Sequence, residues 1–464
     1  MTGTRPVGVM KESENGWLGK AGWVLYQLAA SPYFVIINIF VFASYFQRQV
    51  IGDSVEGQVI WGYTQAIAGA FIALGAPVLG ALADAYGPRK PGLIICSMAA
   101  IPAMLALWFV TPGQVYLGAI AIIIAAVTME YAAVYHNAML PSVARENNIG
   151  FMSGLAYSFD YIGSVSLFLV WLVLPSLGIL ALFEGPFAHE RLSGPLSVLW
   201  LVVFSIPFML FTHDRAAGTL SVTQAITKGL GKLRQTISEV VHYRNVATYL
   251  VVRAIYADGM SAVFNFLAGY LSGIFGWSTA KIGIFALVVL TVPIFTSIIG
   301  GWIDDTIGTK RTIQIGLLVF TLAILGSIST TPNEYLFVFP VTDALRNHQL
   351  PVIGGFLSML GFTQFPEQLS LSFSLIGGAV VGPVLASGRT MVARISPREM
   401  MSEVYGLFTL TGKATAFLAP FFVALVTSAT HSQRAGFAVI LVFLVAGLVG
   451  LFWVREERAE LAQR

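Results

Sequence analysis

Six charged side chains lie inside long apolar stretches of this chain. They are Glu130, Asp160, Arg253, Asp258, Arg389 and Lys413. A charged side chain at the centre of a membrane costs roughly 2.5–3.5 kcal/mol on insertion scales, so each one is a candidate for function. Three are acidic and three are basic, so the set could pair completely.

Two kinds of chemistry fit these charges. In the first, Lys413, Arg389 and Asp258 bind the charged groups of a substrate, and Glu130 or Asp160 takes a coupling proton. Burial suits a carboxylate for exchanging a proton near neutral pH. In the second, the charges are structural ion pairs between helices, and those near span ends place their charged groups in the interface.

The two halves of the chain suggest one specific pairing. Aligning Gly154 with Gly406 brings Asp160 to Gly412, one residue before Lys413. We therefore expect Asp160 and Lys413 to face one another across a central cavity, where transporter sites typically lie.

The elements that carry these charges are long apolar helices. The chain has 464 residues, of which 56% are hydrophobic and 11% charged, whereas soluble domains carry roughly 25% charged residues. A spanning helix needs about 20 mostly apolar residues, and about twelve such stretches follow one another. Only helices satisfy their own backbone groups in lipid over runs of this length. The sequence therefore predicts an all-α membrane protein.

The orientation follows from the basic residues of the loops. Most of the 26 Lys and Arg residues fall on one side of the predicted spans, and this side is expected to be the cytoplasm. Both termini then lie in the cytoplasm, and the short loops suggest a bacterial inner membrane. The net charge of +3, without a basic cluster between aromatics, argues against a nucleic-acid partner.

A repeated loop motif divides the chain into two halves. The first copy runs from Gly80 to Lys90 and the second from Gly301 to Arg311, 221 residues later. The shared positions are Gly80, Asp84, Gly87, Arg89 and Lys90 in the first copy and Gly301, Asp305, Gly308, Lys310 and Arg311 in the second. The glycines allow close helix approach and a tight turn, and the charges are expected to form a cluster that closes a cytoplasmic gate. Plain anchoring by positive residues is the alternative, but it leaves the glycines and aspartates unexplained.

The repeat fixes the expected domain organisation. Residues 1–22 form a cytoplasmic segment, 23–213 a six-helix bundle, 214–245 a linker, 246–454 a second six-helix bundle and 455–464 a tail. In the linker, Ile226, Leu230, Leu233, Ile237 and Val240 recur at helical spacing, which predicts an amphipathic helix on the inner membrane surface.

The layout and several longer stretches resemble a known family. The motif is similar to the signature of the major facilitator superfamily, and the stretches resemble its vacuole effluxer branch, which includes the autophagy-related amino-acid effluxer of yeast vacuoles and bacterial relatives. The stretches are Trp23–Ser31, Tyr135–Pro141, Ser153–Gly154, Arg253–Gly259, Gly377–Arg389, Arg394, Pro397, Tyr405–Gly406, Gly412–Lys413 and Pro420. Gln27 and Ala30 stand where this family usually has an acidic residue and an asparagine, and Asp160 where it often has glycine.

The resemblance implies a major facilitator fold of 12 transmembrane helices in two pseudo-symmetric halves. It also adds Tyr26 and Asn137 to the expected lining of the central cavity. From their positions near a helix end, His136 and Asn137 are interpreted as hydrogen bonders between helices, with a proton relay as the alternative.

The sequence offers nothing that suggests an enzyme, a metal site or a cofactor. The run from Gly406 to Lys413 has five residues between its glycines, not the four of a phosphate-binding loop, and lies in a span. The predicted function is secondary active transport of a small solute, an amino acid or similar polar metabolite. The expected direction is export, coupled to protons, by a monomer in the lipid bilayer. Transport of a lipid-like, amphipathic substrate and a non-transporting receptor or scaffold on the same fold are the alternatives.

Overall fold

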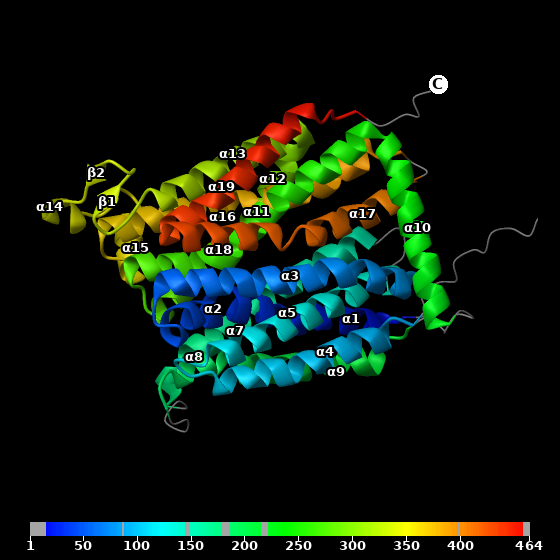
Figure 1. Cartoon of the computed structure of the whole chain (residues 1–464), viewed down its shortest axis with the longest axis horizontal. Helices are drawn as coiled ribbons and strands as arrows, with labels where there is room; N and C mark the ends of the chain where they lie inside the picture. Colours follow the sequence, from blue (N-terminus) through cyan, green and yellow to red (C-terminus); the bar gives the residue numbers. More distant parts are fainter. Residues whose placement is uncertain are drawn as a thin grey trace, which may run out of the picture.

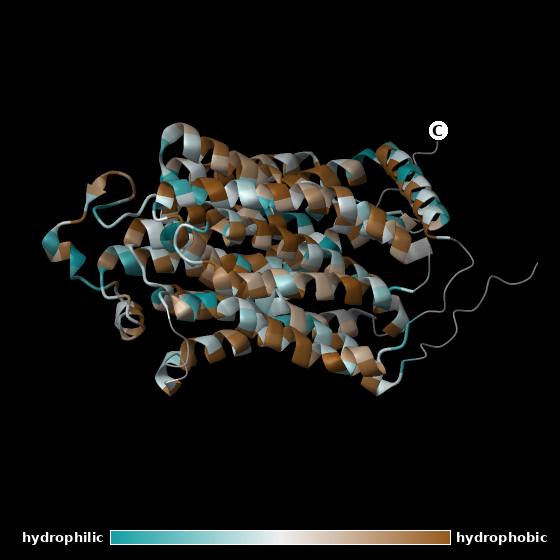
Figure 2. Cartoon of the chain, turned by 60° about the horizontal axis from the view of Figure 1, so that its bottom comes forward, coloured by the Kyte–Doolittle hydropathy of each residue, from teal (hydrophilic) through white to brown (hydrophobic). Residues whose placement is uncertain are grey.

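The computed structural model describes residues 15–85, 88–143, 149–178, 185–214, 221–397 and 400–457. Long helices run side by side and form a bundle (Figure 1). Apolar residues predominate along these helices, and hydrophilic residues gather at the two ends of the bundle (Figure 2). Eleven helical stretches of the described chain are long and apolar enough to cross a membrane. The twelfth, α12, has 29 residues and begins with the apolar stretch Thr279–Pro293.

The helices of the first half precede residue 212. They are α1 (Trp17–Pro32), η1 (Tyr33–Phe40), α2 (Val41–Tyr45), η2 (Phe46–Val50), α3 (Ser54–Ala85), α4 (Lys90–Ala106), η3 (Leu107–Phe109), α5 (Val115–Ala138), α6 (Leu140–Val143), α7 (Ile149–Val173), η4 (Leu174–Leu177), α8 (Ala188–Arg191) and α9 (Ser193–Phe211).

The helices of the second half follow α10 (Val222–His242). They are α11 (Arg244–Phe275), α12 (Thr279–Ile307), α13 (Thr309–Ile328), α16 (Phe365–Ile395), α17 (Met401–Ala414), α18 (Leu418–Thr430), α19 (Gln433–Gly450) and η7 (Leu451–Trp453). Between α13 and α16 lie β1 (Glu334–Tyr335), β2 (Phe339–Pro340), α14 (Asp343–Arg346) and α15 (Gly354–Met359). The two short strands pair antiparallel, with Tyr335 opposite Phe339.

The two halves repeat the same packing. In the first half, α1 packs against α7 and α9, α5 against α3 and α4, and α4 against α9. In the second half, α11 packs against α17 and α19, α16 against α12 and α13, and α13 against α19. Each pairing has its counterpart, which confirms the prediction of two pseudo-symmetric halves of six spans.

The two ends of the bundle differ. The helix α10 runs across one end, here called the linker end (Figure 1). At the opposite end, here called the loop end, the strands β1 and β2 and the helices α14 and α15 extend beyond the spans (Figure 1). The Val352, Phe356 and Met359 side chains, just before and within α15, are exposed.

The first span is irregular because of Pro32. Proline has no N–H, so the Leu28 carbonyl four residues earlier lacks its helical donor. Trp200 Nε1 donates to this carbonyl at 3.0 Å and Ser31 Oγ at 3.3 Å. Directly after Pro32 the backbone becomes π-helical over η1. This geometry is rare in proteins, and where it occurs it is frequently at a functional site.

Candidate functional site

A cavity of about 250 Å³ lies between the two halves. The first half contributes η1, α3 and α5 to its wall, and the second half contributes α11 and α17. Its polar lining residues are Tyr33, Asn38, Gln65, Glu130, Ser261, Asn265 and Lys413. The remaining wall is apolar or glycine, so a few polar groups converge on one small space.

An ion pair joins the halves at this cavity. Lys413 Nζ on α17 donates to Glu130 Oε2 on α5, 283 residues earlier in the chain. The side chains are 20% and 29% exposed, so the pair is accessible from the cavity while mostly enclosed by protein. Lys413 also lies in the last turn of α17, where the helix dipole favours a cation.

A chain of amides continues from this wall. Gln65 Nε2 on α3 donates to Asn38 Oδ1 on η1 at 2.7 Å, and Asn38 Nδ2 donates to Asn265 Oδ1 on α11 at 3.4 Å. The backbone carbonyl of Asn265 also accepts from Trp61 Nε1 at 3.0 Å. The amides therefore form a second polar connection between the halves.

The halves are also joined at the loop end. Arg48 on η2 donates to the Trp277 carbonyl at 2.7 Å and to Ser272 Oγ at 3.1 Å. Gln58 on α3 donates to Thr427 Oγ1 at 2.7 Å and to the Gln433 carbonyl at 3.0 Å. These bonds hold the two halves together between the cavity and the loop end.

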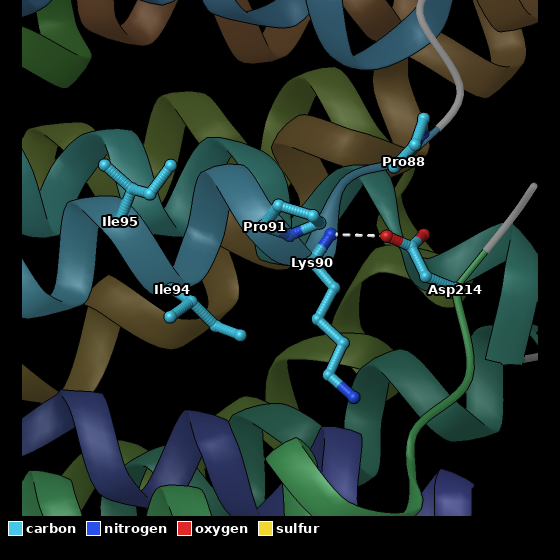
Figure 3. A pocket seen from close by; sticks show the side chains of 6 residues that line it. All are labelled: Pro88, Lys90, Pro91, Ile94, Ile95 and Asp214. Atoms are coloured by element: carbon cyan, nitrogen blue, oxygen red, sulfur yellow. Dashed lines mark hydrogen bonds between the residues drawn. The ribbon is translucent and has the colours of Figure 1, made fainter. Parts of the chain in front are cut away.

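At the linker end, the first copy of the loop motif binds helix ends. The backbone N–H groups of Arg89 and Lys90 donate to Asp214 Oδ2 at 2.7 and 2.6 Å, and Figure 3 shows the bond from Lys90. The buried Arg89 side chain donates to the carbonyls of Ala83, in the last turn of α3, and of Ala138, the last residue of α5. Figure 3 shows the Lys90 side chain directed away from Asp214, and its Nζ reaches the Thr212 carbonyl at 2.8 Å.

The second copy repeats this arrangement with Glu456. The backbone N–H groups of Thr309 and Lys310 donate to Glu456 at 2.9 and 3.1 Å. Arg394 Nη1 donates to the same carboxylate at 2.5 Å, and Arg394 Nη2 lies 3.7 Å from Asp304 and 3.9 Å from Asp305. Partial burial opposes ionisation of Glu456, but these donors outweigh it and lower its pKa below the usual 4.5.

Comparison with known proteins decides the family. The family model described as vacuole effluxer Atg22 like matches residues 49–153 and 151–464. The chain belongs to this vacuole effluxer family.

Members and relatives of the family cover the chain to different extents. A protein of Bacillus subtilis (strain 168), described as the uncharacterized MFS-type transporter YxiO, is 24% identical over 450 residues, which is 94% of each chain. Autophagy-related protein 22 of Pichia angusta is 25% identical over 271 residues, 55% of this chain and 46% of that protein. The chain is thus a multi-pass membrane protein of the major facilitator transporter type.

Solved structures agree on the fold. The nucleoside transporter NupG, as a D323A mutant, has a TM-score of 0.63 at 13% identity and covers 94% of this chain and 98% of its own. A POT family transporter in complex with 5-aminolevulinic acid has a TM-score of 0.62 at 13% identity and covers 95% of this chain and 98% of its own. This confirms the expected major facilitator fold for the effluxer-family member described here.

The structure places some of the predicted site residues in the cavity wall and others outside it. Lys413 and Glu130 line the cavity. Asp258 is buried beside α18, where its Oδ2 accepts from the Ala419 N–H at 3.0 Å. Tyr26 is buried in the first half, with its hydroxyl 2.7 Å from Ser97 Oγ. Tyr26 and Asp258 are therefore placed outside the wall of the cavity.

Two further candidates are exposed. The Arg389 and Asn137 side chains are both exposed, and neither belongs to the cavity wall. The Arg389 carbonyl accepts from the Tyr405 hydroxyl at 3.0 Å. The interpretation of His136 as a hydrogen bonder between helices fits its contacts with α1, where His136 Nε2 and Trp23 Nε1 bond to each other's backbone carbonyls at 2.9 and 3.1 Å.

The expected pairing of Asp160 with Lys413 is wrong. Asp160 Oδ1 on α7 accepts from Gln27 Nε2 on α1 at 2.9 Å, so its partner lies in its own half. Pseudo-symmetry relates equivalent positions, but it does not bring them into contact. Lys413 instead meets Glu130, because α17 approaches α5 at the cavity.

The gate motif is described only in part. The side chain of Asp84 and the residue Gly87 lie outside the described residues. Gly301 lies within α12, and Arg311 is exposed in the first turn of α13. The tight turn expected at Gly308 is present, because this residue joins α12 to α13 with a φ of +91° that favours glycine. The contacts of Arg89, Lys90 and Arg394 given above tie helices of one half together, and closure of a gate between halves stays a prediction.

Sequence reasoning missed the amides. Asn38, Gln65 and Asn265 lie in apolar spans as the charged residues do, and a search for all strongly polar side chains in spans would have found them. Among the described residues, no group of three or more His, Cys, Asp or Glu side chains is arranged to hold a metal ion.

Proposed function

We propose that this protein moves a small polar solute, an amino acid or a chemically similar metabolite, across the membrane by alternating access between its two halves. The observation that carries the proposal is the ion pair between Glu130 and Lys413 at the cavity. It joins the halves at the place where a solute would bind, so binding and the movement of the halves would act on the same two side chains.

The chemistry of the cavity favours a zwitterion. The Lys413 ammonium group attracts a carboxylate, and the Glu130 carboxylate attracts an ammonium group. The amides of Asn38, Gln65 and Asn265 supply donors and acceptors beside them. The volume of about 250 Å³ is below the roughly 300–1,000 Å³ of drug-sized ligand sites, so a small solute fits best.

The ion pair also supplies a mechanism. The carboxylate of a bound zwitterion would pair with Lys413 in place of Glu130, and its ammonium group would pair with Glu130 in place of Lys413. Both side chains would therefore keep a charged partner when the two halves separate on one side. An empty carrier has to break the pair without a replacement, which is costly for partly buried charges. Such a solute shifts the equilibrium between conformations, because its contacts differ between them.

Coupling to protons would act through Glu130. Its carboxylate lies at the cavity and meets Lys413, so protonation would release the lysine for the substrate. Asp160, the other predicted proton carrier, pairs with Gln27 inside the first half and stands further from this exchange. The proposed direction of transport is export from the cytoplasm, by a monomer. The linker end and both termini would then lie on the cytoplasmic side of a bacterial inner membrane.

A lipid-like substrate is less well supported. An apolar pocket next to the cavity shares Ile39 and Phe264 with it, but its volume is about 30 Å³. This is room for one or two water-sized groups and is too small for an acyl chain.

The test is solute flux in proteoliposomes. We expect counterflow of one or more labelled amino acids with the unmodified protein, and a loss of at least tenfold in Lys413→Gln and Glu130→Gln. Lys232→Gln is the matched control, because Lys232 on α10 is 73% exposed and its nearest carboxylate, on Glu403, is 3.9 Å away. Folded protein without flux of any amino acid, peptide, sugar or lipid would instead favour a receptor or scaffold.

A further inference from the structure

The eleventh span is broken beside the cavity. The helix α17 ends at Ala414 and α18 begins at Leu418, with a turn between them. In this turn the Ala416 N–H donates to the Lys413 carbonyl at 3.3 Å and the Leu418 N–H to the Thr415 carbonyl at 2.8 Å. Lys413 and Ala416 both line the cavity. The break therefore gives the cavity a helix end on each side of a short irregular segment.

A broken span needs partners from other helices. In the membrane, backbone groups that leave the helical pattern have to be satisfied by protein or by water in a cavity. The last carbonyls of α17 carry partial negative charge, and the first N–H groups of α18 carry partial positive charge. Neither end can be left without a partner at low cost.

The helix α11 contacts the carboxyl half of α17 and the amino end of α18. Arg253 Nη1 donates to the Phe408 carbonyl of α17 at 2.7 Å and to Thr411 Oγ1 at 3.4 Å, and its guanidinium carbon lies 3.6 Å from the centre of the Phe408 ring. Five residues later, Asp258 accepts from the Ala419 N–H of α18 at 3.0 Å. Between them, the Ala254 carbonyl accepts from Thr415 Oγ1 at 3.2 Å.

The charges on α11 match the two helix dipoles. The Arg253 guanidinium lies against the carboxyl half of α17, and the Asp258 carboxyl group accepts at the amino end of α18, so a donor meets the negative end of one dipole and an acceptor the positive end of the other. Asp258 is 1% exposed, and its other oxygen, Oδ1, has no hydrogen-bond partner among the described residues. The charged residues closest in sequence to Asp258 and to Ala419 are Arg253 on α11 and Lys413 on α17, respectively. The helix α19 packs the apolar side chains of Phe443 and Leu444 against Gly259, the residue after Asp258.

We propose that Arg253 and Asp258 are positioning residues that hold a hinge at 415–417 and thereby keep Lys413 in the cavity. The proposal rests on the proposed role of Lys413 in substrate binding. Lys413 lies one residue before the end of α17, so its direction depends on where that helix stops. Discontinuous spans of this kind build the binding sites of other transporters at the membrane midplane.

The hinge is tested by hydrogen exchange of the full-length protein in nanodiscs. In Asp258→Ala, which removes the acceptor, we expect the amides of residues 415–419 to exchange at least tenfold faster. In Asp258→Asn, whose amide oxygen still accepts, we expect at most a threefold change. Thr430→Val is the matched control, because within the described residues Thr430 Oγ1 bonds to the Val426 carbonyl of its own helix, at 2.7 Å, and to no other helix. Unchanged exchange in Asp258→Ala overturns the proposal.

Transport measurements separate positioning from proton transfer. We expect Asp258→Ala to raise the apparent KM at least fivefold, and Asp258→Asn to transport with nearly unmodified KM and pH profile. Loss of uphill transport in Asp258→Asn, with unchanged exchange at 415–419, would make Asp258 a proton carrier and overturn the positioning role. If Lys413→Gln transports normally while Asp258→Ala still exchanges faster, the proposed function fails and the hinge stands.

Discussion

Asp214 and Glu456 occupy equivalent places in the two halves and cap equivalent helices. Each follows the last span of its half, and each carboxylate accepts two backbone N–H groups at the start of the third span, on α4 or on α13. A carboxylate at a helix amino end satisfies donors that have no partner within the helix and complements the dipole. The repeated loop motif therefore comes with a repeated acidic partner, 125 residues after Arg89 in the first half and 147 residues after Thr309 in the second.

We expect Asp214→Ala and Glu456→Ala each to lower the free energy of unfolding by about 0.5–2 kcal/mol, the usual effect of losing a helix cap. The measurement is the thermal midpoint of the purified protein in detergent. Glu457→Ala is the control for the second half, because Glu457 is exposed and adjacent to Glu456. Equal midpoints for Glu456→Ala and Glu457→Ala would show that the cap contributes no stability.

The cap by Glu456 predicts a pH dependence. Despite partial burial, the N–H groups and Arg394 lower the pKa of Glu456 in the folded protein below 4.5. Its contribution to stability is then complete above the unfolded pKa and is lost as the pH falls through the lower folded pKa. We expect the difference in thermal midpoint between the unmodified protein and Glu456→Gln to be constant from pH 7 to 5 and to shrink below about pH 4.5. A difference that grows on acidification would contradict the direction of this pKa.

The spans and the two halves could be predicted from the sequence, because local apolar composition indicates the spans and a repeated motif indicates the halves. The apolar runs located the helices, and the motif shared by Gly80 and Gly301 divided them. Pro32 leaves the Leu28 carbonyl without its helical donor, but the Trp200 N–H that replaces this donor is brought near only in the folded chain. The same holds for the break at 415–417, since no proline or glycine lies within it and its partners are on α11.

The candidate site was predicted less well for a related reason. Sequence identifies a buried charge but not its partner, because partners come from helices that lie far apart in the chain. Lys413 and Glu130 were both selected, yet Lys413 was assigned to Asp160. Asp258 was selected for its burial, and the structure gives it a backbone partner on α18, not a place in the cavity wall.

The ion pair at the cavity predicts non-additive effects on stability. Glu130→Gln or Lys413→Gln alone leaves one partly buried charge without its partner, and we expect a loss of about 1–3 kcal/mol. The double variant removes both charges, so it should recover most of this loss while transport stays abolished. Thermal midpoints of the two single variants and the double variant give the coupling. Strictly additive losses would mean that the two side chains do not interact in the folded protein.

The amide chain predicts an effect on affinity. Asn265→Leu removes the acceptor for Asn38 and one polar group of the cavity wall, so a polar solute should bind more weakly. We expect the apparent KM to rise about fivefold or more, which corresponds to roughly one hydrogen bond. Gln235→Leu on the exposed side of α10 is the control. An unchanged KM in Asn265→Leu would exclude this amide from the substrate site.

Close approach of the halves at the hinge depends on Gly69 of α3. A Cβ at this position would lie 2.9 Å from the Ala416 carbonyl oxygen and 2.9 Å from the Phe417 nitrogen, and backbone atoms cannot turn away as a side chain can. Gly69→Ala should therefore push α3 from the break, at a cost of about 1–3 kcal/mol. Gly80→Ala on the same helix is the matched control. No described atom lies within 4 Å of its added Cβ, so the close helix approach expected at this motif glycine is absent from the described residues. Alanine there should leave the thermal midpoint unchanged or raise it, since glycine inside a helix costs roughly 0.5–1 kcal/mol. If Gly69→Ala is as stable as Gly80→Ala and transports with an unmodified KM, α3 does not press on the hinge.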